Sequence, residues 1–119
     1  MIDMGDFADR FSESGQRVMK RAYEESKQRE HNFIAPEHIF LALAEVERPL
    51  VNEIMQSLNL DPQAIRNEFD GRLAIQRQFV GKRMKLHEST RDLLNKAMRR
   101  ARQNGRQTID STDLLISLF

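Results

Sequence analysis

The chain has 119 residues, a length typical of one domain, and lacks cysteine, which excludes disulfides and cysteine-ligated metal sites. We recognise no signal peptide and no apolar run of the roughly 20 residues that a membrane span needs, so we expect a cytoplasmic protein without a membrane anchor. The net charge of +1 hides an asymmetry, because residues 76–106 carry ten Lys/Arg and two acids, a net +8, which leaves −7 elsewhere.

Amphipathic helices are predicted for most of the chain, since good helix formers are frequent and glycine and proline are few. The first helix begins at Ser12, a suitable N-cap that is followed by Glu13 in the first turn, where the helix dipole favours negative charge. It runs to about residue 29. Its apolar face recurs at helical spacing, at positions 11, 15, 18, 22 and 26.

The second helix is predicted to begin at Pro36, because proline suits the first helical position and its missing N–H costs nothing there. Glu37 then complements the dipole in the first turn. The helix runs to about residue 47, and the apolar run from Ile39 to Leu43 leaves little room for a polar face. We therefore expect this helix to be buried.

Two more helices complete the first half of the chain. One begins near Pro49 and ends near Asn59, and the next begins at Asp61-Pro62 with apolar residues at every fourth position through Leu73. A connecting segment is predicted over 76–85, where dense charge and a glycine interrupt the helical pattern.

The second half of the chain repeats the first. A fifth helix is predicted from about His87 to Asn104, and a sixth helix begins at Asp110 or Ser111. Position n matches position n+75 without a gap from the pair 11/86 to the pair 44/119. Identities include Glu13/Glu88, Ser14/Ser89, Ala22/Ala97, Gln28/Gln103, Ile34/Ile109 and Leu43/Leu118.

This duplication predicts an all-α fold of two pseudo-symmetric helical repeats that pack as one compact domain. Repeat one covers 11–75, the connecting segment covers 76–85, and repeat two covers 86–119. The second repeat is incomplete, because it lacks counterparts of the third and fourth helices. We therefore expect its last apolar residues to be only partly covered and to favour self-association. These residues are Leu114, Leu115, Ile116, Leu118 and Phe119.

At this point the sequence resembles the Clp N-terminal domain, the double-repeat module of ClpA- and ClpC-type AAA+ unfoldases. The family opens each repeat with Phe-Ser/Thr-Glu, found here at residues 11–13. It later has His-Asn-x-Ile-x-x-Glu-His, found here at residues 31–38, with Ala35-Pro36 in place of the usual Gly-Thr. In the second repeat Thr112-Asp113 stands where Glu-His is expected.

The resemblance implies a non-catalytic docking module that receives protein substrates and adaptor proteins and passes them to the AAA+ ring of the same polypeptide. In the ClpC branch, the start of the first helix and the Glu of Thr-Glu-His recognise phosphorylated arginine. The matching residues are Ser12, with Glu13 beside it, and Glu37. The weaker equivalents in the second repeat are His87 and Thr112.

These residues also have a chemical logic of their own. Free N–H groups at a helix start can hold a phosphate, and a carboxylate can pair with a guanidinium. We therefore expect the starts of the first and second helices to meet and to place Ser12 and Glu37 on one exposed surface. The alternative is that Ser12 is only a cap and Glu37 only complements the helix dipole.

We expect no catalysis and no cofactor. The sequence has no G-x-x-x-x-G-K-[ST] phosphate loop, and no nucleophile is visibly paired with a base. His31, His38 and His87 lack the spacing of a metal site, so we interpret them as ordinary hydrogen-bonded histidines.

Two other functions are open. The basic segment could belong to a small nucleic-acid-binding protein, although Arg99, Arg100 and Arg102 are spaced around a helix and only Phe79 offers a ring for stacking. The chain could also be a stand-alone stress or adaptor protein built from the same module. The reading frame after Phe119 distinguishes that case from an unfoldase.

Overall fold

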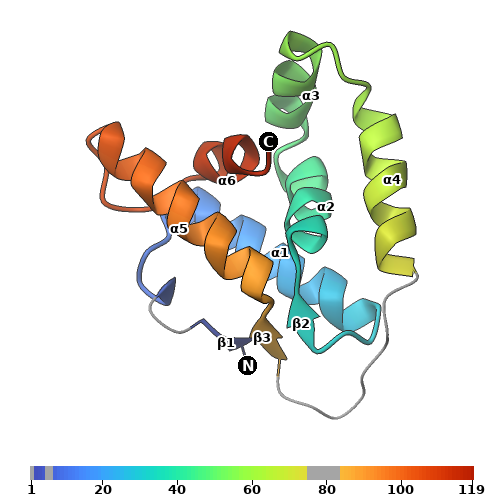
Figure 1. Cartoon of the computed structure of the whole chain (residues 1–119), viewed down its shortest axis with the longest axis horizontal. Coiled ribbons are helices and arrows are strands. Elements are labelled where there is room, and N and C mark those ends of the chain that lie inside the picture. The colour runs from blue at the N-terminus through green and yellow to red at the C-terminus, as the bar shows by residue number, and fades with distance from the viewer. Residues whose placement is uncertain (1, 5–6, 75–83) are drawn as a thin grey trace.

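The structure is a computed structural model, and it describes residues 2–4, 7–74 and 84–119. Helix α2 (Pro36–Val46) lies at its centre, in contact with five other helices. All residues from His38 to Ala44 are buried, because this run has no polar face that could be exposed to solvent. The prediction of a buried second helix that begins at Pro36 is therefore confirmed. Figure 1 shows α2 between α1, α5 and α6 on one side and α3 and α4 on the other.

Helix α1 (Glu13–Gln28) packs against α2 in the opposite direction. Its predicted apolar face is buried, and its polar side pairs with the end of α2 through Arg21 Nε and Glu45 Oε2 at 3.0 Å. At the other end of α1, the Ser26 hydroxyl donates to the carbonyl oxygen of Phe33. The segment before α2 thus lies against the C-terminal end of α1.

Helices α3 (Arg48–Ser57) and α4 (Pro62–Ala74) follow as predicted. Asp61 caps α4 by accepting from the N–H of Gln63 at 3.1 Å. Phe69 of α4 packs edge-on against Phe40 of α2, with ring centroids 4.8 Å apart.

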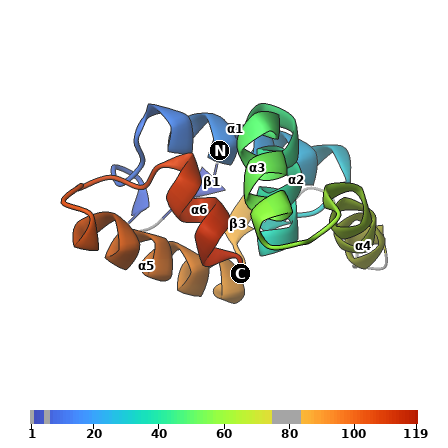
Figure 2. The same cartoon turned by 90° about the horizontal axis from the view of Figure 1, so that it is seen from above.

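Helices α5 (Glu88–Gln103) and α6 (Ser111–Ser117) form the second half. In Figure 2, α6 lies between α1 and α5. The prediction of a partly covered chain end is wrong for Leu114 and Leu115, which are fully buried. The reason is that α2, α1 and α5 together cover α6, so the second repeat needs no copies of α3 and α4. Leu118 is half-buried, and Phe119 is 48% exposed.

Three very short strands join the two halves, and the sequence pattern did not predict them. They are β1 (Ile2–Asp3), β2 (Phe33–Ile34) and β3 (Met84–Leu86), and they pair in parallel in the order β1-β3-β2. Met84 and Lys85, predicted as connecting segment, therefore belong to β3. The rest of that segment, 76–83, lies outside the described residues.

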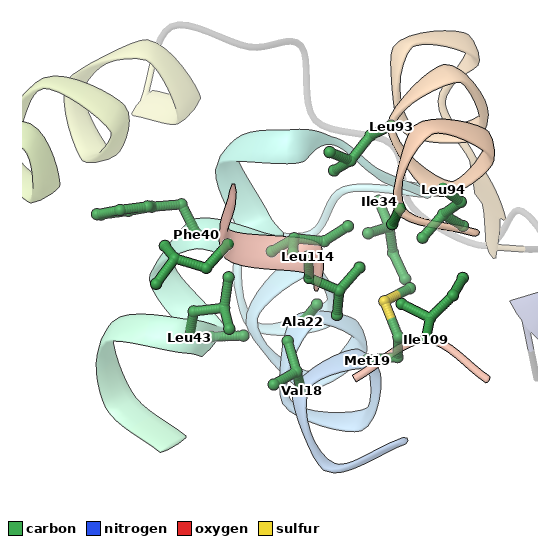
Figure 3. Close-up of a cluster of buried hydrophobic side chains, with 14 of the residues drawn as sticks. Val18, Met19, Ala22, Ile34, Phe40, Leu43, Leu93, Leu94, Ile109 and Leu114 are labelled. Carbon is green, nitrogen blue, oxygen red and sulfur yellow. The ribbon is translucent and has the colours of Figure 1, made fainter. Parts of the chain in front are cut away.

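The core is shared between the two halves. Figure 3 shows side chains of α1, α2, α5 and α6 converging in one cluster, with Val18 and Leu114 among them. Ile34 and Ile109, which occupy equivalent positions in the two repeats, are both fully buried in it. Within the described part of the chain, no helix is both long and apolar enough to cross a membrane.

Candidate functional site

The starts of α1 and α6 form one junction, in which each repeat contributes a helix start. Ser12 N donates to the carbonyl oxygen of Ile109 at 3.0 Å, and Ile109 N donates to that of Arg10 at 2.7 Å. The Ser12 hydroxyl caps α1 by accepting from Gly15 N at 3.3 Å. The N–H of Ser111, the first residue of α6, donates to Ser14 Oγ at 3.1 Å.

The starts of α5 and α2 form a second junction with the same plan. His87 N donates to the carbonyl oxygen of Ile34 at 3.0 Å, as Ser12 N does to Ile109. The Thr90 hydroxyl donates to the same Ile34 oxygen at 2.6 Å. His87 caps α5, because its Nδ1 accepts from Ser89 N at 3.2 Å. The two donors, Ser12 and His87, are 75 residues apart, and so are the two acceptors, Ile34 and Ile109. Equivalent residues of the two repeats thus make equivalent hydrogen bonds.

The two junctions are crossed between the repeats, and this corrects one prediction. Ser12 lies at the start of α1, whereas Glu37 begins α2 beside the far end of α1. A helix of 16 residues is about 24 Å long, so Ser12 and Glu37 do not share one surface. Ser12 instead meets the start of α6, which carries Thr112, and Glu37 lies on the helix whose start meets His87.

The predicted site residues differ in how accessible they are. Glu13 is almost fully exposed, with 92% of its side chain accessible, and lies 3.7 Å from Arg17. The Glu37 side chain is 23% exposed, and Oε2 lies 3.9 Å from Nη1 of Arg72 on α4. His87 is exposed and Thr112 is half-buried. At the second junction, the start of α2 therefore carries a partly buried carboxylate that lies towards α4, and the start of α5 carries the exposed His87.

Next to each junction, a pair of polar side chains closes the turn before the helix; both members are buried in the first repeat, and only Asp113 is buried in the second. In the first repeat, Ala35 N donates to His38 Nδ1 at 2.9 Å, which makes Nδ1 an acceptor. Nε2 of His38 then carries the proton and donates to His31 Nδ1 at 3.0 Å. This chain of hydrogen bonds requires both rings to be neutral.

The equivalent pair in the second repeat is ionic. Asp110 N donates to Asp113 Oδ2 at 2.9 Å, as Ala35 N does to His38. Arg106 Nη2 donates to Asp113 Oδ1 at 2.8 Å, so the pair occupies the positions of His31 and His38. Arg100 Nε lies 3.4 Å from the same carboxylate without the alignment of a hydrogen bond. The Asp113 side chain is fully buried.

The protonation of these pairs follows from their surroundings. Burial, together with His31 and Arg29, lowers the pKa of His38 to about 3. Burial, with the nearby Arg29 charge, also lowers the pKa of His31. Burial alone would raise the pKa of Asp113, but hydrogen bonds from Arg106 and from Asp110 N–H outweigh it and leave that pKa below its ordinary value.

His31 and His38 close the turn before α2 through their side chains. Among residues 2–4, 7–74 and 84–119, no group of three or more His, Asp or Glu side chains could hold a metal ion. The interpretation of His31 and His38 as hydrogen-bonded histidines is confirmed by their direct contact. Sequence reasoning missed the Arg106–Asp113 pair, although the spacing of 75 from His31 and His38 pointed to it.

The model of the Clp repeat (R) N-terminal domain family matches residues 10–119. The chain belongs to this family. This chain is 26% identical to the "ATP-dependent Clp protease ATP-binding subunit ClpA homolog" of Porphyra purpurea over 110 residues. The aligned region covers 92% of this chain and 13% of that protein. The chain is 26% identical over 111 residues to "Chaperone protein ClpC2, chloroplastic" of Oryza sativa subsp. japonica, covering 93% of this chain and 12% of that protein.

Solved structures share the fold of this Clp N-terminal domain. The N-terminal domain of ClpV1 ATPase from E. coli is 28% identical, with a TM-score of 0.76 over 92% of this chain and 67% of that chain. The Hsp104 N-terminal domain from Candida albicans has a TM-score of 0.79 over 92% of this chain and 73% of that chain, with 13% identity, so that likeness concerns the fold alone. The all-α class is thereby confirmed.

Proposed function

We propose that this Clp N-terminal domain is the substrate- and adaptor-docking module of an ATP-dependent Clp unfoldase, and that it has no catalytic activity of its own. The main support is the family match over residues 10–119. The chain spans about 13% of the length of the ClpA homolog that it matches, so the attached AAA+ ring is itself part of the proposal. The cytoplasm is the compartment in which we expect it.

The proposed docking site is the junction of α2 and α5. Glu37 offers a partly buried carboxylate, which suits a guanidinium. The first turn of α5 offers the exposed Ser89, whose N–H and hydroxyl both lie within hydrogen-bond distance of the exposed His87 ring and would suit a phosphate in its place. Phosphorylated arginine carries both groups on one side chain. The α1/α6 junction supports this ligand less well, because Ser14 already accepts from the start of α6 and Thr112 has no charge.

Calorimetry with a phosphoarginine peptide tests this site. Substitution Glu37→Gln removes the charge and keeps the size of the side chain. The lost contact to a charged group is worth roughly 1.5–3 kcal/mol, so we expect binding to weaken at least about tenfold. Glu24→Gln, on the exposed side of α1, makes the same chemical change away from the junction and should bind as the wild type does.

Two outcomes would contradict the phosphoarginine site. One is equal affinity for the wild type and Glu37→Gln, and the other is no binding by the wild type, which would leave docking of adaptor proteins as the function. The Thr112→Val variant should matter much less than Glu37→Gln, because position 112 carries no carboxylate.

Nucleic-acid binding is the weaker alternative. Phe79, the ring considered for base stacking, lies outside the described residues. Within the described part of the chain, only Leu58 and Phe119 are large apolar residues with exposed side chains, so the basic helix α5 presents no exposed aromatic ring. A steep loss of affinity for nucleic acid with added salt would favour this alternative.

A further inference from the structure

A groove along α5 borders both helix-start junctions, because its lining includes Arg10, whose carbonyl accepts from Ile109 N, and Arg91 in the first turn of α5. A cavity of about 440 Å³ lies between α5 and the segment Phe7–Arg10 that leads into α1. Its charged lining consists of Arg10, Arg91, Arg99 and Arg102. A second cavity of about 420 Å³ shares Arg10 and Arg102 with the first and extends it towards Gly105 and Gln107. In Figure 1 the lead-in segment follows α5 along one side.

The four guanidiniums are exposed and have no anionic partner among the described residues. None of them lies within 4 Å of a carboxylate in the segments 7–74 and 84–119, although Glu88 and Asp92 neighbour Arg91 on the same helix. Arg100, by contrast, faces Asp113 in the interior. Of the three arginines expected to be spaced around the helix, Arg99 and Arg102 line this groove and Arg100 lies towards Asp113.

The floor of the groove is apolar. Phe7 and Met98 line it and are only 8% and 6% exposed, so they offer a surface for a small apolar side chain but no free ring for stacking a base. From Arg91 to Arg102 the helix rises by about 16 Å, the length of about five residues of extended chain. A line of cations of this length over an apolar floor suits a peptide better than a single-stranded nucleic acid.

We propose that this groove binds an extended acidic peptide segment, whose carboxylates pair with Arg99 and Arg102 and whose central apolar side chain lies against Met98. The inference goes beyond the proposed function, because it requires neither phosphoarginine nor Glu37. It assigns the domain a second surface for a partner of defined chemistry. The pairing of several exposed cations with a flexible acidic segment also predicts binding that weakens with added salt.

Fluorescence anisotropy can test the groove with a labelled peptide of Glu and Asp around a central Leu. A control peptide carries Gln and Asn in place of the acids. The double substitution Arg99→Gln/Arg102→Gln should weaken binding of the acidic peptide roughly five- to tenfold, because two exposed ion pairs are lost. The matched double substitution Lys27→Gln/Lys96→Gln removes the same charge outside the groove and should change the affinity by less than about twofold.

The outcomes separate this inference from the proposed function. Unchanged affinity of the acidic peptide for Glu37→Gln is the expected result, and a loss in that variant would assign the peptide to the α2/α5 junction instead. No binding by the wild type, equal binding of the neutral peptide, or equal losses in the two double variants would each overturn the proposal. So would a single-stranded oligonucleotide of equal charge that binds the groove more tightly than the peptide.

Discussion

At the scale of single residues, the two repeats close the same turn with different chemistry. His38 and Asp113 each accept a hydrogen bond from the backbone N–H three residues earlier, and each then contacts a side chain seven residues earlier. One pair is neutral and the other is ionic. The geometry of the turn therefore tolerates either solution, provided that the buried acceptor is satisfied.

The neutral pair predicts a dependence of stability on pH. An unfolded histidine has a pKa near 6.5 and takes up a proton as the pH falls below that value, whereas folded His38 stays neutral down to about pH 3. The unfolded state thus binds more protons in this window. As the pH decreases below about 6.5, the free energy of unfolding should therefore decrease by up to about 1.4 kcal/mol per pH unit for each buried histidine.

Urea unfolding between pH 7 and 4.5 measures this effect. The His38→Asn variant, whose amide oxygen can still accept from Ala35 N as Asp113 does from Asp110 N in the other repeat, should lose the part of the slope that His38 contributes. Asp113, with its lowered pKa, contributes only at lower pH, below its ordinary value of 3.8. A flat profile in the wild type would show that the buried histidines are not neutral as described.

At the scale of secondary-structure elements, two helical glycines predict opposite effects of the same substitution. A Cβ at Gly71 in α4 would meet nothing within 4 Å, so Gly71→Ala should stabilise the domain by about 0.5–1 kcal/mol. A Cβ at Gly15 in α1 would overlap the carbonyl oxygen of Ile109. Gly15→Ala should therefore separate α1 from the start of α6 and destabilise the domain by about 1–3 kcal/mol. Chemical denaturation gives both values, and shifts of equal sign would contradict the account.

The helices could be predicted from the sequence because their signals are local. Caps, prolines and apolar periodicity lie within each segment, and six of six predicted helices exist with starts within one residue, from α1 after Ser12 to α6 after Asp110. Strands of two or three residues carry no periodicity. Their pairing joins Phe33 to Lys85 across the chain, which no local pattern reports.

The residues of the proposed site are sequence predictions, and their arrangement in space could not be predicted from the sequence. Motif spacing located Ser12 and Glu37, and the repeat located His87 and Thr112. Which helix starts meet depends on how the repeats pack. The sequence allows the start of α1 to meet either α2 of its own repeat or α6 of the other repeat, and the prediction that Ser12 and Glu37 meet within one repeat is wrong. The burial of Leu114 was missed for the same reason, since its cover comes from α2 of the other repeat.

At the scale of the whole molecule, each repeat completes the other. Ile34 of the first repeat accepts from the start of α5, and Ile109 of the second accepts from the start of α1, so neither repeat alone contains a whole junction. The domain measures 39 × 33 × 20 Å, and its arginine groove extends along α5 from Arg91, in the turn that also belongs to the α2/α5 junction, to Arg102. This arrangement would place the two proposed binding sites, the arginine groove and the α2/α5 junction, on one small domain.

A double-mutant cycle on phosphoarginine-peptide binding tests the crossed junction most directly. Calorimetry would measure the binding free energy in two cycles, each with the wild type, two single variants and the double variant. One cycle combines Glu37→Gln with Ser89→Ala at the start of α5, and the other combines Glu37→Gln with Ser12→Ala at the start of α1. Residues that hold two ends of one bound group show coupling of about 0.5–3 kcal/mol, whereas distant residues add within about 0.3–0.5 kcal/mol. The account predicts coupling between Glu37 and Ser89 and additivity between Glu37 and Ser12. Coupling to Ser12 with additivity at Ser89 would contradict it.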